Sequence, residues 1–337
     1  MKRPNLLYIG NNLTQKTKYN STLTLLSNLL KEEGYPIFIS SDKSNRIIRL
    51  LEMCFAVLKY RKKVSYILID TFSSTNFYYA LCTSQMARLC NIKYIPILHG
   101  GNLPNRIKKS TFFSKLIFDN AYYNIAPSHY LKSAFEKQGY QVKFIPNIIE
   151  IENYTFKKRE NIQPKLLWVR AFKKIYNPTM AIEVLHTLLQ EYPKATLCMV
   201  GPIVDGTYEN CLNLVEKYNL KDKVVFTGVL IKEAWHKKAA DYDVFINTTN
   251  FDNTPISVME AMALGLPVVS TNVGGIPYLL EDKKDALLVA PENYKEMTLA
   301  IVRILEGEFK NIPFKARQKV ETFDSSIIIN TWKEILK

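Results

Sequence analysis

Short apolar segments typical of strands alternate with longer segments of helical periodicity along almost the whole chain. In the first part of the chain, the expected strands cover residues 5–9, 35–40, 66–69, 93–98, 121–125 and 142–145. Between them, helical periodicity covers residues 22–33, 46–60, 75–90 and 128–138. Strands connected through helices pair in parallel, and helices then cover both faces of the sheet. The sequence therefore predicts an α/β fold of the doubly wound, Rossmann-like kind.

A polar, charged and weakly periodic stretch divides this pattern in two. We expect residues 1–150 to form an N-terminal Rossmann-like domain and residues 151–164 to form a linker. Residues 165–320 form a second Rossmann-like domain, with strands at 165–169, 195–200, 224–226, 244–247 and 268–271. Residues 321–337 contain a further helix, which follows the last expected strand. A chain of 337 residues suits two domains of roughly 150 residues each.

Positive charge is concentrated in the N-terminal domain. Residues 1–150 hold 21 Lys and Arg against 8 Asp and Glu, whereas residues 151–337 hold 24 against 23. Such asymmetry indicates an anionic partner, although a lysine-rich solvated surface explains it equally well. Nucleic acid is not expected, because no fold signature of nucleic-acid recognition accompanies the basic run at 59–63. An anionic membrane surface is the other candidate, and residues 46–58 suit either an amphipathic membrane anchor or a helix covering the first sheet.

The sequence gives no sign of a membrane span or of export. No apolar run approaches the roughly 18 residues that span a bilayer, and the N-terminus enters the first strand without an apolar signal region. The five cysteines are scattered and never spaced as metal-binding pairs, which suits reduced thiols. We expect a cytoplasmic protein that can associate peripherally with the inner face of the cell membrane.

The stretch from Phe251 to Pro267 joins a buried strand to a short helix. Thr254 is a good N-cap residue, Pro255 suits the first helical position, and Gly265 suits the end of the helix. The N-terminus of this helix faces the carboxyl edge of the sheet, where α/β folds bind ligands. Free N–H groups at such an end can hold a phosphate. The expected groups are those of Ile256, Ser257 and Val258.

Two acidic residues flank this anion site. Asp252 lies in the loop before the helix, and Glu260 lies about one and a half turns inside it. They could be an ordinary turn residue and a solvated helix position. However, Glu260 stands among small and apolar residues, whereas a solvated face would carry more charge. We therefore interpret the pair as ligand-binding, with N–H groups for phosphate and carboxylates for sugar hydroxyls.

This stretch resembles the signature of glycosyltransferase family 4, whose members are retaining enzymes with the two-domain GT-B fold. The signature is an acidic residue, seven intervening residues, and then Glu in a Glu-Ala-Met-Ala-x-Gly-x-Pro-Val-Val run, which here covers residues 260–269. The family usually has Glu at the first acidic position, where this chain has Asp252, and often Glu where this chain has Tyr278. The resemblance implies two Rossmann-like domains facing across a cleft. It also implies an acceptor domain at 1–150, a donor domain at 165–320, and a final helix that crosses back to the N-terminal domain.

The resemblance also implies roles for individual residues in binding the donor. Glu260 would hold the ribose hydroxyls and Asp252 would lie by the donor sugar. A basic pair, Arg170 with Lys174, would hold the diphosphate. Further donor contacts are expected at the helix start and at loops that follow strands, namely at Thr254, Pro255, Ile256, Ser257, Gly201 and Val229.

The N-terminal domain offers fewer candidates. Gly10 ends the first strand and opens a polar loop, residues 11–21, which could approach the donor phosphates. His99 stands at the end of a strand and is followed by two glycines. The resemblance implies that such a histidine contacts the donor sugar and takes part in catalysis with Asp252 and Glu260. His129, His186 and His236 lack this context and are interpreted as structural.

The expected activity is transfer of a sugar, with retention of configuration, from a nucleotide diphosphate sugar, UDP-linked more readily than GDP-linked. The acceptor would be a glycan or a polyprenyl-diphosphate-linked sugar in the biosynthesis of capsule, O-antigen or exopolysaccharide. No bound cofactor and no metal are expected, and the Asp-x-Asp at 241–243 is not interpreted as a metal site. No G-x-G-x-x-G occurs, which argues against a nicotinamide or flavin enzyme. The alternatives are another GT-B enzyme, such as an epimerase or phosphorylase, or a non-catalytic subunit that binds the nucleotide sugar.

Overall fold

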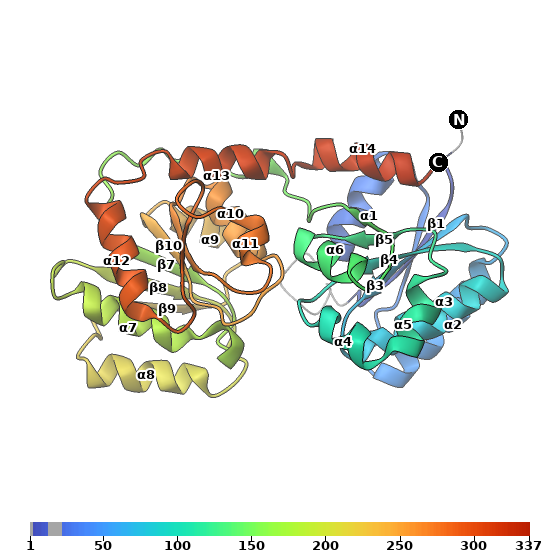
Figure 1. The fold of residues 1–337 in the computed structure, drawn as a ribbon, viewed down its shortest axis with the longest axis horizontal. Helices are drawn as coiled ribbons and strands as arrows, with labels where there is room; N and C mark the ends of the chain where they lie inside the picture. The colour runs from blue at the N-terminus through green and yellow to red at the C-terminus, as the bar shows by residue number, and fades with distance from the viewer. Residues whose placement is uncertain (1–2, 13–21) are drawn as a thin grey trace. The chain divides into compact units, whose positions relative to one another are not determined.

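A computed structural model describes residues 3–12 and 22–337 of the chain. These residues form two compact units, each with its own sheet (Figure 1). Unit 1 is drawn from Met1–Ile148 and Phe323–Lys337, and unit 2 is Ile149–Thr322. None of the helices in the described part of the chain combines the length and apolar character that spanning a bilayer requires.

Unit 1 contains a six-stranded sheet in which every neighbouring pair is parallel. The strand order is β2-β1-β3-β4-β5-β6. The strands are β1 (Leu6–Ile9), β2 (Ile37–Ser40), β3 (Tyr66–Thr71), β4 (Lys93–Leu98), β5 (Asn124–Ala126) and β6 (Val142–Phe144). The sheet changes winding direction between β1 and β3, so the loops that follow these two strands diverge and leave room for a ligand.

Alternating side chains of these strands build two cores on opposite faces of the sheet. From β1, Leu6 and Tyr8 enter one core, whereas Leu7 and Ile9 enter the other. The first core is covered by α1 (Thr22–Glu32) and α14 (Ser325–Ile335). The second is covered by α2 (Arg46–Tyr60), α3 (Asn76–Leu89), α4 (Leu103–Lys109), α5 (Thr111–Phe118) and α6 (His129–Glu136). Residues 13–21, which include most of the polar loop expected after Gly10, lie outside the described part of the chain.

Unit 2 contains a second six-stranded parallel sheet, in the order β12-β11-β10-β7-β8-β9. Its strands are β7 (Lys165–Val169), β8 (Thr196–Val200), β9 (Val224–Gly228), β10 (Val244–Asn247), β11 (Val268–Thr271) and β12 (Leu287–Val289). Its helices are α7 (Pro178–Leu188), α8 (Thr207–Lys217), α9 (Lys232–Ala239), α10 (Ile256–Ala263), α11 (Ile276–Leu279), α12 (Tyr294–Leu305) and α13 (Ile312–Glu321), with short 3₁₀ turns η2 (Ile151–Asn153) and η3 (Lys174–Tyr176). The winding changes direction between β7 and β10, which are paired side by side.

The segment expected to be a linker, residues 151–164, is part of unit 2. Tyr154 is 2% exposed, and its hydroxyl donates to the Glu260 carboxylate. The buried guanidinium of Arg159 donates to the carbonyls of Ala239, Tyr242 and Gly265, which lie at helix and loop ends. These side-chain contacts fix the segment although its sequence has no periodicity. Sequence periodicity also missed β12 and the helices α4, α5, α12 and α13.

The final helix, α14, packs on unit 1. Ile328, Trp332 and Ile335 enter the same core as α1, and Lys333 pairs with Glu33 near the end of α1. The hydroxyl of Tyr66 donates to the carbonyl of Lys337. The polypeptide therefore leaves unit 1 after residue 148 and re-enters it at residue 323.

Trp332→Ala should lower the free energy of unfolding of unit 1 by about 3–5 kcal/mol, because it removes a buried aromatic side chain from the core. Ile327→Ala in the same helix is the control, since Ile327 is 50% exposed and should change stability by less than about 1 kcal/mol. Chemical denaturation followed by circular dichroism measures both variants. Equal effects would show that α14 does not fold with unit 1.

Candidate active site

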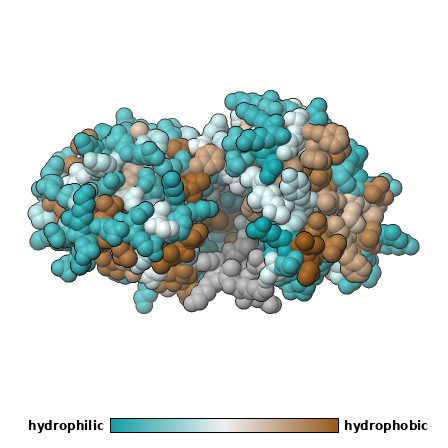
Figure 2. Space-filling view, turned by 90° about the horizontal axis from the view of Figure 1, so that it is seen from below, coloured by the Kyte–Doolittle hydropathy of each residue, from teal (hydrophilic) through white to brown (hydrophobic). Residues whose placement is uncertain are grey.

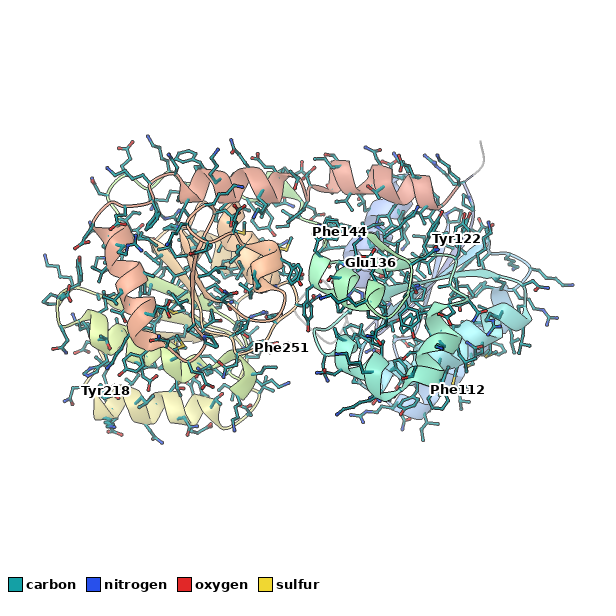
Figure 3. The ribbon with its side chains drawn as sticks, in the orientation of Figure 1. Phe112, Tyr122, Glu136, Phe144, Tyr218 and Phe251 are labelled. Atoms are coloured by element: carbon teal, nitrogen blue, oxygen red, sulfur yellow. The ribbon has the colours of Figure 1, made fainter. Side chains whose placement is uncertain are left out.

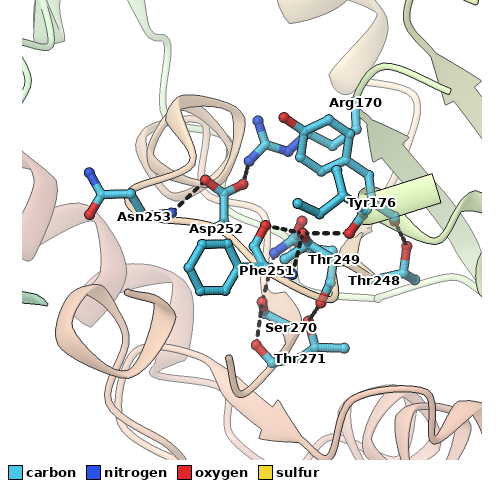
Figure 4. Close-up of polar contacts among 11 residues, drawn as sticks. Arg170, Tyr176, Thr248, Thr249, Phe251, Asp252, Asn253, Ser270 and Thr271 are labelled. Carbon is cyan, nitrogen blue, oxygen red and sulfur yellow. Dashed lines mark hydrogen bonds and ion pairs between the residues drawn. The ribbon is translucent and has the colours of Figure 1, made fainter. Parts of the chain in front are cut away.

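Arg170 is the first residue after β7, and its guanidinium is buried at the carboxyl edge of the sheet of unit 2. It forms an ion pair with the carboxylate of Asp252, in the loop that follows β10 (Figure 4). The other face of the guanidinium lies over the ring of Tyr176, 4.6 Å from its centroid. Burial lowers the pKa of Arg170 from its usual value. Because β7 and β10 flank the change of winding, the ion pair lies where a doubly wound sheet binds its ligand.

The loop after β10 is fixed to its neighbours by hydrogen bonds (Figure 4). The hydroxyl of Thr248 donates to the carbonyl of Tyr176 (2.8 Å), and the backbone N–H of Asn250 donates to the carbonyl of Ile175 (2.8 Å). On the other side, the hydroxyl of Thr271, at the end of β11, donates to the carbonyl of Thr249. Asp252 therefore stands on a loop that is held from both sides.

Two glycines let a neighbouring loop pack against Asp252. The N–H of Gly275 donates to the carbonyl of Asp252 at 2.9 Å. A Cβ on Gly275 would lie 1.8 Å from the carbonyl oxygen of Asn253, and one on Gly274 would lie 2.3 Å from that of Asp252. Any side chain at either position would displace the loop, so the Gly-Gly pair after β11 is required for the position of the carboxylate.

Helix α10 starts one residue later than the sequence predicted. Pro255, with ψ of 115°, is the N-cap, and Ile256 is the first helical residue. Thr254 is therefore not the N-cap, because Pro255 has an extended ψ rather than the helical value of a first residue. The N–H of Val258 is also not free, since it donates to the carbonyl of Pro255 (3.1 Å). Helical geometry leaves the N–H groups of Ile256 and Ser257 available at this end.

Several polar atoms near this helix end are buried and lack a hydrogen-bond partner within the described residues. They are Nε of Arg170 and the hydroxyl oxygens of Thr254 and Ser257. Buried polar groups in folded proteins are nearly always hydrogen-bonded, so unpaired groups indicate a bound ligand or ordered water. Cationic and hydroxyl groups of this kind, with the N–H groups of α10, suit the oxygens of a phosphate.

Glu260 lies inside α10, and its carboxylate is almost fully buried. Its Oε1 accepts a hydrogen bond from the hydroxyl of Tyr154 (2.8 Å) and lies 3.6 Å from Nζ of Lys232 and 3.7 Å from Nε2 of His236. The ring of Tyr154 also packs against His236, with centroids 4.6 Å apart. Burial, followed by the neighbouring Glu260 carboxylate, raises the pKa of Tyr154 far above its usual value, so this hydroxyl stays protonated and donates.

The sequence did not indicate these neighbours of Glu260. His236 was interpreted as structural, and Tyr154 lay in the expected linker. Lys232 and His236 are four residues apart on α9 and thus share one face of that helix. The four-residue spacing of Lys232 and His236 was the one sign of these neighbours in the sequence. It does not show what this face of α9 contacts.

The remaining predicted residues of unit 2 lie at the same carboxyl edge. Lys174 is exposed in η3, and its backbone N–H donates to the Asp205 carboxylate (2.9 Å). In the structure the partner on this loop that packs against Arg170 is Tyr176. Gly201 follows β8 with φ of +154°, and a Cβ there would lie 1.8 Å from the carbonyl oxygen of Arg170. Val229 follows β9 and is 37% exposed.

Unit 1 contains a separate polar cluster at its own change of winding. The carboxylate of Asp70, in β3, accepts a hydrogen bond from the hydroxyl of Tyr8 (2.9 Å) and lies 2.9 Å from Nε2 of His99. An ionised carboxylate only accepts hydrogen bonds, so the Nε2–H of His99 is the donor where Asp70 is ionised. Gly10 lies beside this cluster, where a Cβ would be 2.5 Å from the Asp70 carboxylate. Phe72 stacks on the ring of His99 with centroids 5.0 Å apart.

The Asp-x-Asp at 241–243 serves the fold. The carboxylate of Asp243 lies 3.4 Å from the buried guanidinium of Arg159 and accepts from the N–H of Gln163 (3.0 Å). Within residues 3–12 and 22–337, no group of three or more His, Cys, Asp and Glu side chains is arranged to hold a metal ion.

The fold is shared with solved glycosyltransferase structures. Sucrose-phosphate synthase from Thermosynechococcus elongatus superposes with a TM-score of 0.81 at 17% identity, over 98% of each chain. HepE from Anabaena, solved in complex with UDP and glucose, superposes with a TM-score of 0.78 at 17% identity, over 99% of each chain. The protein thus has the GT-B fold, and the prediction of an α/β fold with two Rossmann-like sheets is confirmed.

Comparison with the sequences of known proteins shows which family the chain belongs to. Residues 150–322 match the family Glycosyl transferases group 1, and the chain belongs to this family. AmsK from Erwinia amylovora, an amylovoran biosynthesis glycosyltransferase, is 28% identical over 210 residues, which cover 56% of this chain and 49% of the relative. The matches span about half the length, or less, of the first curated relatives. The family match includes the residues described above for unit 2 and excludes Gly10 and His99.

Gly275→Ala should lower the stability of unit 2 by about 1–3 kcal/mol, because the added Cβ displaces the backbone that holds Asp252. Gly206→Ala is the control, since its Cβ would meet nothing closer than 4.0 Å and its φ of −66° suits alanine. Thermal denaturation measures both variants. A Gly275→Ala variant as stable as the wild type would contradict the role given to this contact.

Proposed function

We propose that this protein transfers a sugar from a nucleotide diphosphate sugar to a glycan or lipid-linked acceptor, with retention of the anomeric configuration. The observation that carries the proposal is the ion pair of Arg170 with Asp252, on the loop that leads into α10, the helix that carries the buried Glu260. UDP is favoured over GDP as the nucleotide, because the structural neighbour HepE was solved with UDP, with UDP and glucose, and with UDP-glucose.

The diphosphate would bind between Arg170 and the first N–H groups of α10. The Asp252 carboxylate neutralises Arg170. A diphosphate brings more negative charge than one carboxylate and would compete for the guanidinium, which frees Asp252 to contact the donor sugar. As the bond between the sugar and the diphosphate breaks, negative charge grows on the leaving phosphate. Arg170 and the helix dipole would then stabilise that charge, and we propose that no metal is needed.

The ribose would bind at Glu260. A buried carboxylate can accept hydrogen bonds from both neighbouring ribose hydroxyls, which distinguishes a nucleotide from free phosphate. Tyr154 holds one oxygen of this carboxylate in place, and the ammonium of Lys232 keeps the local charge balanced. We propose that these two residues position Glu260 and do not themselves take part in the reaction.

In unit 1, we propose that His99 contacts the donor sugar, with Asp70 as its positioning residue. The hydrogen bond to Asp70 fixes the ring orientation and tautomer of His99, and Gly10 leaves the space in which this pair fits. This arrangement resembles the way a carboxylate orients a histidine in many enzyme sites. The acceptor would bind to unit 1, as the resemblance to family 4 implies.

We also propose a role in the biosynthesis of a surface polysaccharide, because the relative AmsK is named as an amylovoran biosynthesis glycosyltransferase. We propose that the protein works in the cytoplasm or on the inner face of the cell membrane. A non-catalytic subunit would bind the same donors without transferring the sugar, so binding and transfer have to be measured separately.

UDP should raise the melting temperature of the purified protein in the presence of EDTA, with a stabilisation of about 2.7 kcal/mol at a hundredfold excess over the dissociation constant. Glu260→Gln should weaken binding by about tenfold or more, because a charged hydrogen-bond acceptor for the ribose is lost. Glu209→Gln, at an exposed position of α8, is the control and should bind as the wild type does. A thermal shift with GDP or ADP but not with UDP would show that the donor carries a different base. The absence of a shift with any nucleotide would refute the proposed donor site.

Arg170→Gln should lower kcat/KM for sugar transfer by about 10²–10³, because the leaving phosphate loses a preorganised cation. It should also destabilise unit 2, since Asp252 is left buried without its partner. The double variant Arg170→Gln/Asp252→Asn should recover stability without recovering activity, which separates the two effects. The control is Arg303→Gln on the surface of α12. Transfer is followed by release of UDP, and NMR of the product reports whether the anomeric configuration is retained.

A further inference from the structure

Helix α2 of unit 1 is apolar on two opposite sides. Its inner side packs on the sheet through Met53, Ala56 and Val57, all of which are buried. Its outer side exposes large apolar residues, with exposed fractions between 45% and 71%. These residues are Ile47, Ile48, Leu51, Phe55 and Leu58. At 3.6 residues per turn they lie within an arc of about 100°, so they form one continuous stripe along the helix.

The stripe continues on the neighbouring helices. Helix α3 packs between α2 and α5, and its exposed residues include Tyr78 (44%) and Leu89 (85%). On the far side, α5 exposes Phe112 (71%) and Phe113 (40%), and Phe112 lies at the outer side of the unit (Figure 3). Seen from this side, apolar residues gather on the surface of unit 1 (Figure 2). We call the exposed apolar residues of α2, α3 and α5 the apolar face of unit 1.

Basic residues surround the apolar face. Residues 46–63 and 103–119 together hold ten Lys and Arg against two acidic residues, and α3 holds one Arg and no acidic residue. Exposed basic residues stand at both ends of the stripe of α2, namely Arg46, Lys59, Arg61, Lys62 and Lys63. Three more, Lys108, Lys109 and Lys115, are exposed on α4 and α5.

We propose that the apolar face of unit 1 docks onto the surface of an anionic lipid bilayer. Large aliphatic and aromatic side chains would enter the boundary between head groups and acyl chains, and the surrounding lysines and arginines would contact anionic head groups. A second copy of the chain fits this face less well, because association would bring two sets of the same basic residues together. The bilayer satisfies both the apolar and the charged parts of the face with one partner.

This inference depends on unit 1 alone and is independent of the donor site in unit 2. It gives a specific location to the excess of positive charge in residues 1–150. It also accounts for both interpretations of α2, because the inner side of the helix covers the sheet while the outer side is free to meet lipid. A lipid-linked acceptor would then be presented to unit 1 from the surface on which the protein rests.

The test is co-sedimentation of the full chain with vesicles, without nucleotide. One set contains phosphatidylcholine alone, and the other contains about one-third phosphatidylglycerol, which gives an anionic surface. The wild type should sediment with the anionic vesicles, much less with the neutral ones, and less as salt is raised. Leu51→Glu/Phe55→Glu should lower the partition coefficient by about tenfold or more, because two apolar side chains that would enter the interface become charged.

Leu299→Glu is the matched control, since Leu299 is 63% exposed on α12 of unit 2, outside the apolar face. It should bind vesicles as the wild type does, and circular dichroism should show that all variants are folded. UDP binding by the double variant should be unchanged, so failure here is distinguishable from failure of the proposed donor site. The proposal is overturned if the wild type binds neither vesicle, or if the double variant binds like the wild type. It is equally overturned if the wild type is a dimer that the double variant dissociates, since a second copy then covers the face.

Discussion

The burial of one guanidinium, that of Arg170, is the constraint on which the ligand-binding edge of unit 2 depends. Leaving a buried charge without a partner costs several kcal/mol, about 3–5 when one member of a pair is removed. Here the Asp252 carboxylate lies on one side of it and the ring of Tyr176 on the other. These partners come from different loops, so neutralising one charge also fixes the loops to each other. The positive charge is thereby preorganised before any phosphate binds.

Close backbone approach is what allows these loops to meet around Arg170. Gly201 lies against the carbonyl of Arg170, and Gly275 lies against the carbonyl of Asn253, at distances where no Cβ fits. Each contact joins the loop after one strand to the loop after its neighbour in the sheet. These two glycines therefore have a structural role beyond ending a strand or a helix. They set the separation between the elements that present the charged side chains.

Sequence reasoning predicted the parts of this site that depend on local pattern. Strand and helix periodicity gave the parallel sheets, and the spacing from Asp252 to Glu260 gave the two acidic residues on the loop and helix after β10. It missed the contacts of Glu260 with Tyr154 and His236, because they join segments far apart in the chain and no local period encodes them. It also placed the start of α10 one residue early, since the ψ of Pro255 is set by its surroundings and not by proline itself.

The outer face of α2 shows a second limit of structure prediction from sequence periodicity. Periodicity identifies a buried face by contrast with a polar one, and α2 offers little contrast, because apolar residues point both toward the sheet and away from it. Only the packing of Met53 and Val57 against the core reveals which side is covered. The side that is left exposed then needs its own explanation, since monomeric soluble proteins seldom expose contiguous apolar patches beyond a few hundred Å². The basic residues around it argue that the partner is negatively charged, and a helix lying in the plane of an anionic bilayer satisfies both requirements.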